Sequence, residues 1–285
     1  MDAAPATRTP ARPGRARSRL NPGLTLGLAL FVLVVPVMFL GDWLYPVSPF
    51  ALHTAHALEP PSWRFPLGTD ALGRDLLARL FSGGVQTLIV SIPAAALAFL
   101  VGTSYGLASG LGPRWLDGLM MRILDAVLAL PSLIVLIFLA AIVTLSAPSL
   151  ILLLGLVSWP GLARLVRNET VAQRNRDFVL AARQLGASTA YVARVHLARV
   201  MAPLLVVNAT LLVGDMISSL SALSFLGLGV QPPQTSWGGL LQNGLSLIAL
   251  RPWWLIVPPG LMIFAALFAT SLIGEATIGR RRVVR

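Results

Sequence analysis

The chain has 285 residues, of which 56% are hydrophobic and only 12% are charged. Because soluble domains carry about 25% charged residues, this composition argues against an ordinary soluble protein and favours an integral membrane protein. All 22 basic residues are Arg, and the absence of Lys and Cys excludes disulfides, thiolate metal sites and a Walker A loop with its phosphate-binding lysine.

Six apolar stretches are long enough to cross a membrane, and they predict an all-α integral membrane protein with six transmembrane helices. Several prolines, Pro131 among them, lie inside these stretches, where they could kink the helices. The stretches lie at about residues 24–45, 86–109, 119–145, 148–167, 203–227 and 253–275.

Arginine is distributed unevenly between the two sides of these spans. If the N-terminus is cytoplasmic, 18 of the 22 Arg fall on the cytoplasmic side, and four fall outside: Arg64, Arg74, Arg79 and Arg251. The positive-inside rule therefore predicts a multi-pass protein with both termini in the cytoplasm. The net charge of +11 is explained by this topology, so we expect contact with membrane lipid and no nucleic-acid partner.

The spans divide the chain into five parts. The first predicted helix is interpreted as a retained signal anchor, because no small-residue cleavage site follows it. The parts are a cytoplasmic basic tail (1–20), the first transmembrane helix (21–46), an extracytoplasmic segment (47–85), a five-helix core (86–276) and a second cytoplasmic basic tail (277–285).

The extracytoplasmic segment 47–85 contains an apolar stripe at helical spacing, formed by Leu76, Leu77 and Leu80. This stripe predicts a short amphipathic helix lying at the outer membrane interface. Asp75 and Arg79 are four residues apart, so they could form an ion pair on that helix.

The three histidines offer little for catalysis or metal binding. His53 and His56 could share a helix face, but no acidic pattern completes a metal site around them. His196 also falls outside the predicted spans, which argues against a hydrolase buried in the membrane. We therefore expect no catalytic residue, no metal and no cofactor bound by this chain.

An arginine-rich stretch, residues 168–200, interrupts the apolar sequence on the cytoplasmic side. Four apolar residues recur in it at positions i, i+3, i+4 and i+7, so they share one face of a short helix. These residues are Phe178, Ala181, Ala182 and Leu185. The small alanines would let another backbone approach this face closely.

The ends of this helix also carry recognisable signals. Asp177 suits the positive N-terminal end of the helix dipole, and Gly186 suits the position just after the C-terminal end. Ser188 can cap a second short helix, which carries its own stripe formed by Tyr191, Val192 and Val195. The pattern alone leaves open whether these helices pack on the protein's own spans or dock into a separate protein.

The same stretch resembles the EAA loop of ABC-importer permeases, the element that inserts into the ATP-binding subunit. The resemblance implies an ATPase-docking role for seven residues of the loop. Leu180 departs from the motif, which has Glu there, and Arg199 departs from a common Pro. The docking residues are Asp177, Phe178, Ala181, Ala182, Leu185, Gly186 and Ser188.

Two further stretches, at residues 66–84 ("PLGTDALGRDLLARLFSGG") and 223–238 ("LSFLGLGVQPPQTSWG"), resemble the second permease subunit of the dipeptide/oligopeptide/nickel importer family. The resemblance implies a type I ABC-importer permease of the bacterial inner membrane. Its partners would be a sister permease in a heterodimer, two ATP-binding subunits and an extracytoplasmic substrate-binding protein. ATP would be used by the partner subunits, while this chain, itself no enzyme, carries peptides, nickel complexes or similar small solutes by alternating access.

Two acids inside predicted spans are candidates for the translocation path, because an acid at mid-bilayer is costly to insert. Asp125 lies near Arg122, which favours a structural pairing, whereas Asp215 has no partner visible in the sequence. These two acids also define an alternative function, a stand-alone secondary transporter coupled to protons. Such a transporter usually has more spans and an inverted repeat, neither of which is found here.

Overall fold

The computed structural model describes residues 22–279, and this part of the chain contains helices and loops but no β-strand. The predicted all-α class is therefore confirmed. The basic tail at 1–20 and the last six residues of the predicted tail 277–285 lie outside the described residues. In chain order the helices are α1 (Pro22–Phe39), α2 (Gly41–Leu44), η1 (Thr54–His56), α3 (Leu76–Leu111), α4 (Arg114–Leu128), α5 (Ser132–Ile142), α6 (Ala147–Arg174), α7 (Asp177–Gln184), α8 (Thr189–Tyr191), η2 (Val192–Leu197), α9 (Ala198–Phe225), α10 (Trp237–Ser246), η3 (Ile248–Leu250) and α11 (Trp253–Gly279).

Four of the described helices are long and apolar enough to cross a membrane: Leu76–Leu111, Ala147–Arg174, Thr189–Phe225 and Trp253–Gly274. The pair α4 and α5 makes a fifth candidate, but the two helices meet at a bend of 78° instead of forming one straight span. Pro131 precedes α5 and disfavours helical geometry in the residue before it, which explains the break. α1 is apolar but shorter, so the count of six spans stays a prediction.

The start of α3 differs from the sequence prediction. Leu76, Leu77 and Leu80 belong to the first turns of the 36-residue α3 and not to a separate amphipathic helix. Leu76 and Leu80 are buried in the bundle, so the stripe faces protein. Gly83 and Gly84 follow this stripe but do not break the helix, which continues into the span. Without side chains of their own, they leave room for side chains of neighbouring helices.

The α3–α6 pair is packed through a stripe of glycines. Gly102, Gly106 and Gly110 recur every fourth residue on the face of α3 that contacts α6. A Cβ atom at Gly106 would lie 2.6 Å from the carbonyl oxygen of Ala163, far inside contact distance. Small residues at this spacing let two membrane helices approach until their backbones touch.

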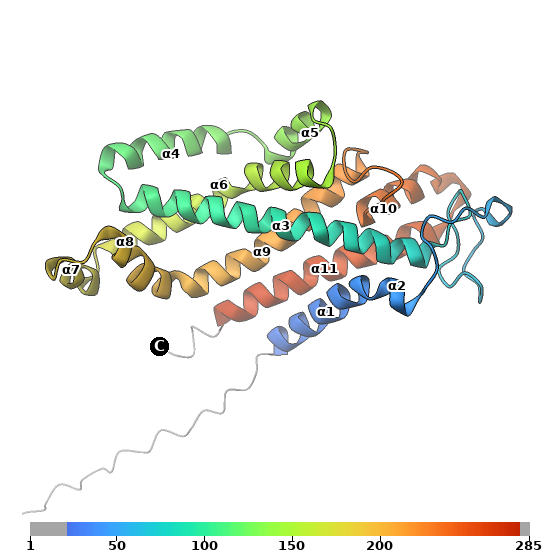
Figure 1. Cartoon of the computed structure of the whole chain (residues 1–285), viewed down its shortest axis with the longest axis horizontal. Helices are drawn as coiled ribbons and strands as arrows, with labels where there is room; N and C mark the ends of the chain where they lie inside the picture. The colour runs from blue at the N-terminus through green and yellow to red at the C-terminus, as the bar shows by residue number, and fades with distance from the viewer. Residues whose placement is uncertain (1–21, 280–285) are drawn as a thin grey trace, which may run out of the picture.

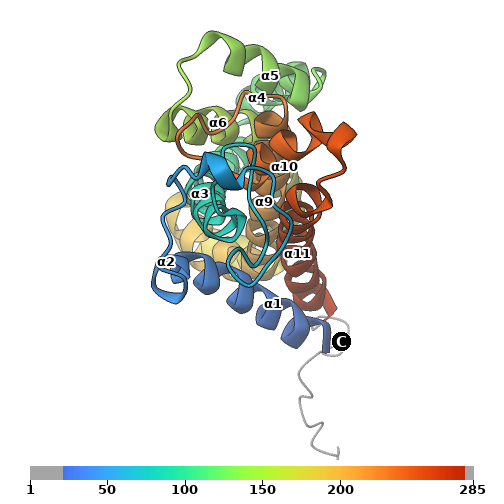
Figure 2. The ribbon, with the colours of Figure 1, turned by 90° about the vertical axis from the view of Figure 1, so that its right-hand side faces the viewer.

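A second core joins the N-terminal half of α3 to α1, α9, α10 and α11. Trp237, the first residue of α10, is fully buried there and donates its indole N–H to the carbonyl oxygen of Leu80 at 3.1 Å. Figure 2 shows α1 and α11 on one side of α9, and α4 and α5 on the opposite side. The N-terminal part of α3 is therefore fixed against the α9–α10 connection.

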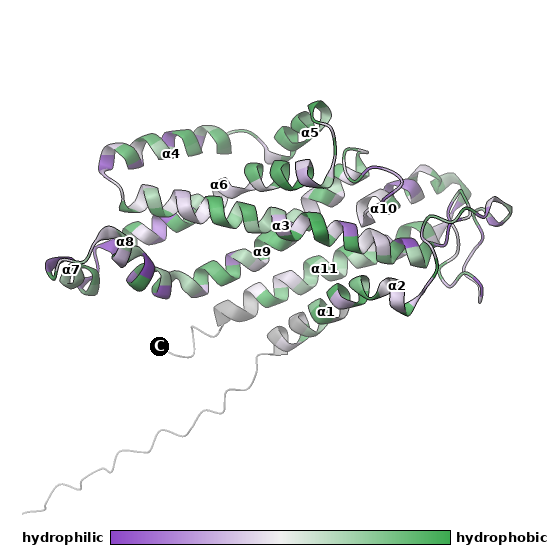
Figure 3. Ribbon diagram, viewed as in Figure 1, coloured by the Kyte–Doolittle hydropathy of each residue, from purple (hydrophilic) through white to green (hydrophobic). Residues whose placement is uncertain are grey.

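The two ends of the bundle differ in character. α7 and α8 lie at one end, and the loop before α3 lies at the opposite end with α10 (Figure 1). Hydrophobic residues run along the helices between them, and hydrophilic residues gather at the α7–α8 end and in the loop before α3 (Figure 3).

Candidate docking surface and buried polar groups

The α7 helix ends in a well-formed C-terminal cap. Gly186 adopts a left-handed φ of +86°, and its N–H donates to the carbonyl oxygen of Arg183 at 3.0 Å. The N–H of Ala187 donates to the carbonyl oxygen of Ala182, also at 3.0 Å. These two bonds form the Schellman motif, which glycine favours because it has no Cβ.

The second helix of this stretch is longer than the sequence suggests. Ser188 caps it as predicted, accepting a hydrogen bond from the N–H of Tyr191 at 3.2 Å. The chain then runs without interruption from Thr189 through a π-helical turn, η2, into α9, which makes one 37-residue helix. The prediction of a second short helix is wrong, because no breaking residue stands between 189 and the span; Pro203 is accommodated within α9.

α7 and the start of this long helix enclose an open groove of about 790 Å³. Six of the seven predicted docking residues line it, and Asp177 does not. Leu185 is 89% exposed at its rim, and Phe178 and Tyr191 are also exposed. The six are Phe178, Ala181, Ala182, Leu185, Gly186 and Ser188.

Three further residues complete the groove: Ala187, Tyr191 and His196. The His196 ring lies 6.0 Å from the ring of Phe178 and 5.7 Å from that of Tyr191, measured between ring centres. Tyr191 belongs to the second predicted apolar stripe, so the sequence pattern did indicate its place on a helix face. Val179 is fully buried and anchors α7 to the bundle, while Leu180 is exposed outside the groove.

The intramembrane acids lie on different helices and are not brought together by an ion pair or hydrogen bond. Asp125 of α4 pairs with Arg164 of α6, so the structural pairing is found with a different partner from Arg122. A second pair on the same two helices, which sequence analysis missed, joins Asp117 to Arg167 at 2.5 Å, with Ser109 donating to Asp117 at 2.6 Å. These partners lie 39 and 50 residues apart in the sequence, so helical spacing gives no signal for them.

Asp215 is exposed on α9 beside a depression of about 320 Å³ shared with α11. Ser218, Thr270 and Ser271 contribute hydroxyl groups to this depression. Among the side chains that the structure describes, none forms an ion pair or hydrogen bond with Asp215. A carboxylate in this position needs water, a substrate or another subunit beside it, since lipid contact would be costly.

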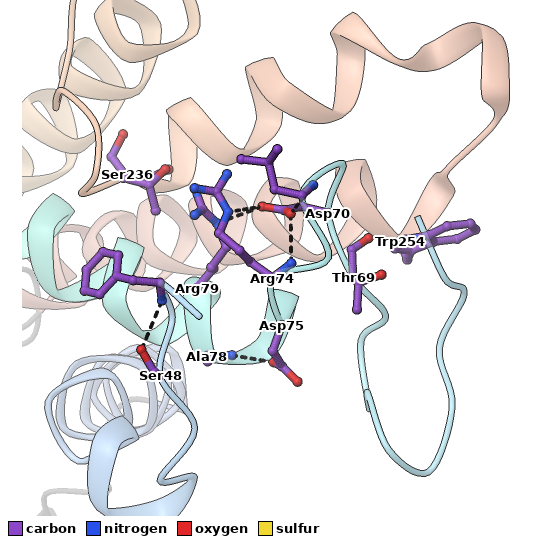
Figure 4. A network of polar contacts seen from close by, with 12 residues as sticks. Ser48, Thr69, Asp70, Arg74, Asp75, Ala78, Arg79, Ser236 and Trp254 are labelled. Atoms are coloured by element: carbon purple, nitrogen blue, oxygen red, sulfur yellow. Dashed lines mark hydrogen bonds and ion pairs between the residues drawn. The ribbon is translucent and has the colours of Figure 1, made fainter. Parts of the chain in front are cut away.

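The loop before α3 holds a network of polar groups (Figure 4). Asp75 caps α3, accepting from the N–H of Ala78 at 2.9 Å and from the hydroxyl of Tyr45 at 2.8 Å. Burial and the neighbouring Asp75 carboxylate raise the pKa of Tyr45 to about 12. The predicted Asp75–Arg79 pair is therefore wrong, because the cap turns Asp75 away and Arg79 pairs with Asp70 instead.

One histidine of this loop, His56, has ordinary side-chain partners. His56 Nδ1 lies 2.7 Å from Glu59 Oε1, and its other ring nitrogen lies 3.3 Å from Arg64. Within the described part of the chain, no three His, Cys, Asp or Glu side chains gather as metal ligands would.

Comparison with known proteins places these features in a family. Residues 101–282 match the model of the family described as "Binding-protein-dependent transport system inner membrane component". The chain is 37% identical to the di/tripeptide transport system permease protein DppC of Pseudomonas aeruginosa, over 90% of this chain and 86% of that protein. It is 35% identical to the dipeptide permease DppC of Bacillus subtilis, over 89% and 78% of the two chains. It is 31% identical to the oligopeptide permease OppC of the same organism, over 91% and 85%.

Proposed function

We propose that this chain, which belongs to the family of binding-protein-dependent transport system inner membrane components, carries peptides across the inner membrane. The chain is a multi-pass permease subunit of a binding-protein-dependent ABC importer and not an enzyme. Peptides are favoured because the similar proteins named above are di/tripeptide, dipeptide and oligopeptide permeases. Nickel complexes or similar small solutes are the second candidate class.

We further propose that the α7 groove is the place where an ATP-binding subunit docks. The observation that carries this proposal is the exposure of Leu185, Phe178 and Tyr191 around a groove of about 790 Å³. Exposed apolar side chains around a concave surface are typical of protein interaction sites. One wall of the groove is the start of the helix that continues directly into the span α9. A movement of the docked subunit would therefore move this transmembrane helix.

In this proposal the chain pairs with a sister permease, and two ATP-binding subunits bind from the cytoplasm. Closure of the ATP-binding subunits would pull on α7 and switch the pathway between inward-open and outward-open packings, a rigid-body transition. ATP binds to the partner subunits, and this chain holds no cofactor. The α7 end and both termini are proposed to be cytoplasmic, in agreement with the arginine distribution.

The end of the bundle formed by the loop before α3 and by α10 would then receive the substrate-binding protein. Asp215 is proposed to face the translocation path, where its carboxylate could attract a peptide amino group.

The alternative of a proton-coupled secondary transporter is weakened by Asp125, because the contact with Arg164 holds that carboxylate in an ion pair.

Co-purification and reconstitution test the proposal together. The chain should bring ATP-binding subunits with it from the membrane, and proteoliposomes containing the full importer should take up a dipeptide only with ATP. Uptake by the permease chains alone, driven by a proton gradient, would contradict the importer proposal.

A further inference from the structure

A polar cavity of about 410 Å³ lies at the end of the bundle opposite α7. Its walls come from the loop before α3 and the first turns of α3, from the end of α9 and its connection to α10, and from α10 itself. Neutral amide side chains make up much of the lining, Gln234 and Asn243 among them. The volume falls within the range of about 300–1,000 Å³ that is typical of small-molecule pockets.

Arg79 lines this cavity and is only 3% exposed. Its Nε and Nη1 atoms are buried and, among the residues that the structure describes, have no hydrogen-bond partner. The carboxylate paired with it is Asp70, whose Oδ2 lies 3.5 Å from Nε. That distance allows an ion pair but not a good hydrogen bond.

Asp70 already accepts three hydrogen bonds from other donors. Its Oδ2 accepts from Arg74 Nε at 2.7 Å, and its Oδ1 accepts from the N–H groups of Leu72 and Arg74 at 2.8 and 3.0 Å. Figure 4 shows Arg74 and Arg79 converging on this one carboxylate. Asp75, the acid nearest in sequence, is held by Tyr45 and Ala78.

These contacts leave one positive charge without an equal counter-charge, since two guanidinium groups share a single carboxylate. A buried charge that is only partly compensated destabilises the protein. The site is therefore incomplete as it stands, and one further monoanion would balance it. A dianion such as phosphate would overcompensate the single charge.

A second unpartnered donor points to the same cavity. Ser224 of α9 lines it, is 4% exposed, and has a buried Oγ without a hydrogen-bond partner among the described residues. Buried hydroxyl groups almost always find a partner, so each exception needs an explanation. Here the Nε and Nη1 atoms of Arg79 and the hydroxyl of Ser224, from two different helices, both lack a hydrogen-bond partner among the described residues.

We propose that this cavity binds the C-terminal carboxylate of a peptide substrate on the extracytoplasmic side. The planar guanidinium of Arg79 matches a carboxylate, the hydroxyl of Ser224 can donate to it, and the neutral amides suit a peptide backbone. This proposal rests on the proposed peptide-import function and names a recognition site for its substrate.

Binding to the complete importer, assembled without its binding protein, tests the site directly. The probes are dialanine, its C-terminal amide and acetate, and the readout is the apparent dissociation constant from the shift of the thermal unfolding midpoint. Dialanine should bind at least about ten-fold more tightly than its amide, because a charged hydrogen bond is lost in the amide. Acetate should bind more weakly than dialanine, since it offers no backbone to the neutral amides.

Two variants leave Arg79 intact and so avoid the risk of misfolding. Ser224→Ala should weaken dialanine binding about ten-fold, and Gln234→Glu, which adds a negative charge at the cavity, should weaken it by at least as much. Neither should change binding of the amide. Ser221→Ala is the matched control. Ser221 also lies on α9 and has a buried Oγ without a hydrogen-bond partner among the described residues, but it does not line the cavity.

The proposal is overturned if both variants bind dialanine like the wild type, or if the amide or acetate binds as tightly as dialanine. It is also overturned if the variants weaken docking of the peptide-free binding protein, which would assign the cavity to an acidic side chain of that protein. ATP-driven uptake of dialanine by wild-type proteoliposomes distinguishes failure of the transport proposal from failure of the carboxylate-site proposal. No uptake would contradict the transport function, whereas normal uptake with unaltered variants would contradict only the carboxylate site.

Discussion

Ala187 donates its backbone N–H to the carbonyl oxygen of Ala182 at 3.0 Å, and Gly186 stands in left-handed geometry within the loop that this bond closes. The bond fixes the end of α7 one residue before Ser188 caps the helix that becomes α9. The docking groove and the span are therefore joined by a short, hydrogen-bonded turn. A turn of this kind can transmit a push or pull, whereas a flexible linker would absorb it.

Replacement of Gly186 by Val should uncouple ATP hydrolysis from transport. A β-branched residue in left-handed geometry costs about 1–2 kcal/mol, and the turn would relax to avoid it. Apart from the two chain neighbours of Gly186, no atom of the described structure lies within 4 Å of the position that a Cβ would take, so the effect comes from the backbone and not from a clash. Gly186→Asn is the control, because Asn tolerates this geometry. The ratio of peptide taken up to ATP hydrolysed in proteoliposomes should fall for Val and stay near wild type for Asn.

Replacement of Gly106 by Val should destabilise the α3–α6 pair. The new side chain would be forced against the carbonyl oxygen of Ala163, and overpacking of this kind costs about 1–3 kcal/mol. Gly161→Val in α6 is the control, because nothing in the described structure lies within 4 Å of its Cβ position. Thermal unfolding in detergent should show a lower midpoint for the Gly106 variant alone. Equal midpoints would mean that the glycine stripe does not set the approach of the two helices.

The hydrogen bond from Tyr45 to Asp75 should make part of the stability depend on pH. The pKa of Tyr45 is raised from 10.0 to about 12, so the folded protein keeps the phenol protonated where the unfolded chain loses the proton. This contribution is complete below pH 10 and falls as the pH rises toward 12. Unfolding by denaturant should show wild type more stable than Tyr45→Phe at pH 8, with the difference shrinking above pH 10. A constant difference across this range would be inconsistent with the bond.

Asp215→Asn tests the proposed translocation path. The carboxylate lies beside the hydroxyls of Ser218 and Thr270 and has no ionic partner among the described side chains, so the change should not break an ion pair within the chain. We expect several-fold slower uptake of a dipeptide and near-normal uptake of its N-acetylated form, which lacks the amino group. Unchanged uptake and substrate affinity for both peptides would remove Asp215 from the path.

Local features of the docking surface could be predicted from the sequence because they depend on neighbours. Gly186, Ser188 and the apolar stripe of α7 act within one or two helical turns, and the structure places them as the pattern suggests. The all-α class followed from hydrophobicity in the same way. The pattern could not show whether a short helix continues into the next transmembrane helix, because the start of a long helix and a short separate helix have the same apolar stripe.

Pairings between distant residues could not be predicted for a related reason. Asp75 and Arg79 have ideal helical spacing, yet Asp75 lies at the N-cap and Arg79 is drawn to Asp70 in the preceding loop. Asp125 is near Arg122 in sequence but contacts Arg164, which packing of α4 on α6 brings close. Spacing indicates which pairs are possible, and tertiary packing decides among them.

The central claim, that the α7 groove receives an ATP-binding subunit, is tested most directly by one pair of matched variants. Leu185 and Leu180 are both exposed leucines of the α7 segment, but only Leu185 lines the groove. Leu185→Glu should abolish co-purification of the ATP-binding subunits and dipeptide uptake, because a charge would be buried in an apolar contact. Leu180→Glu should retain both. Retention of the ATP-binding subunits by Leu185→Glu, or their equal loss in both variants, would contradict the account.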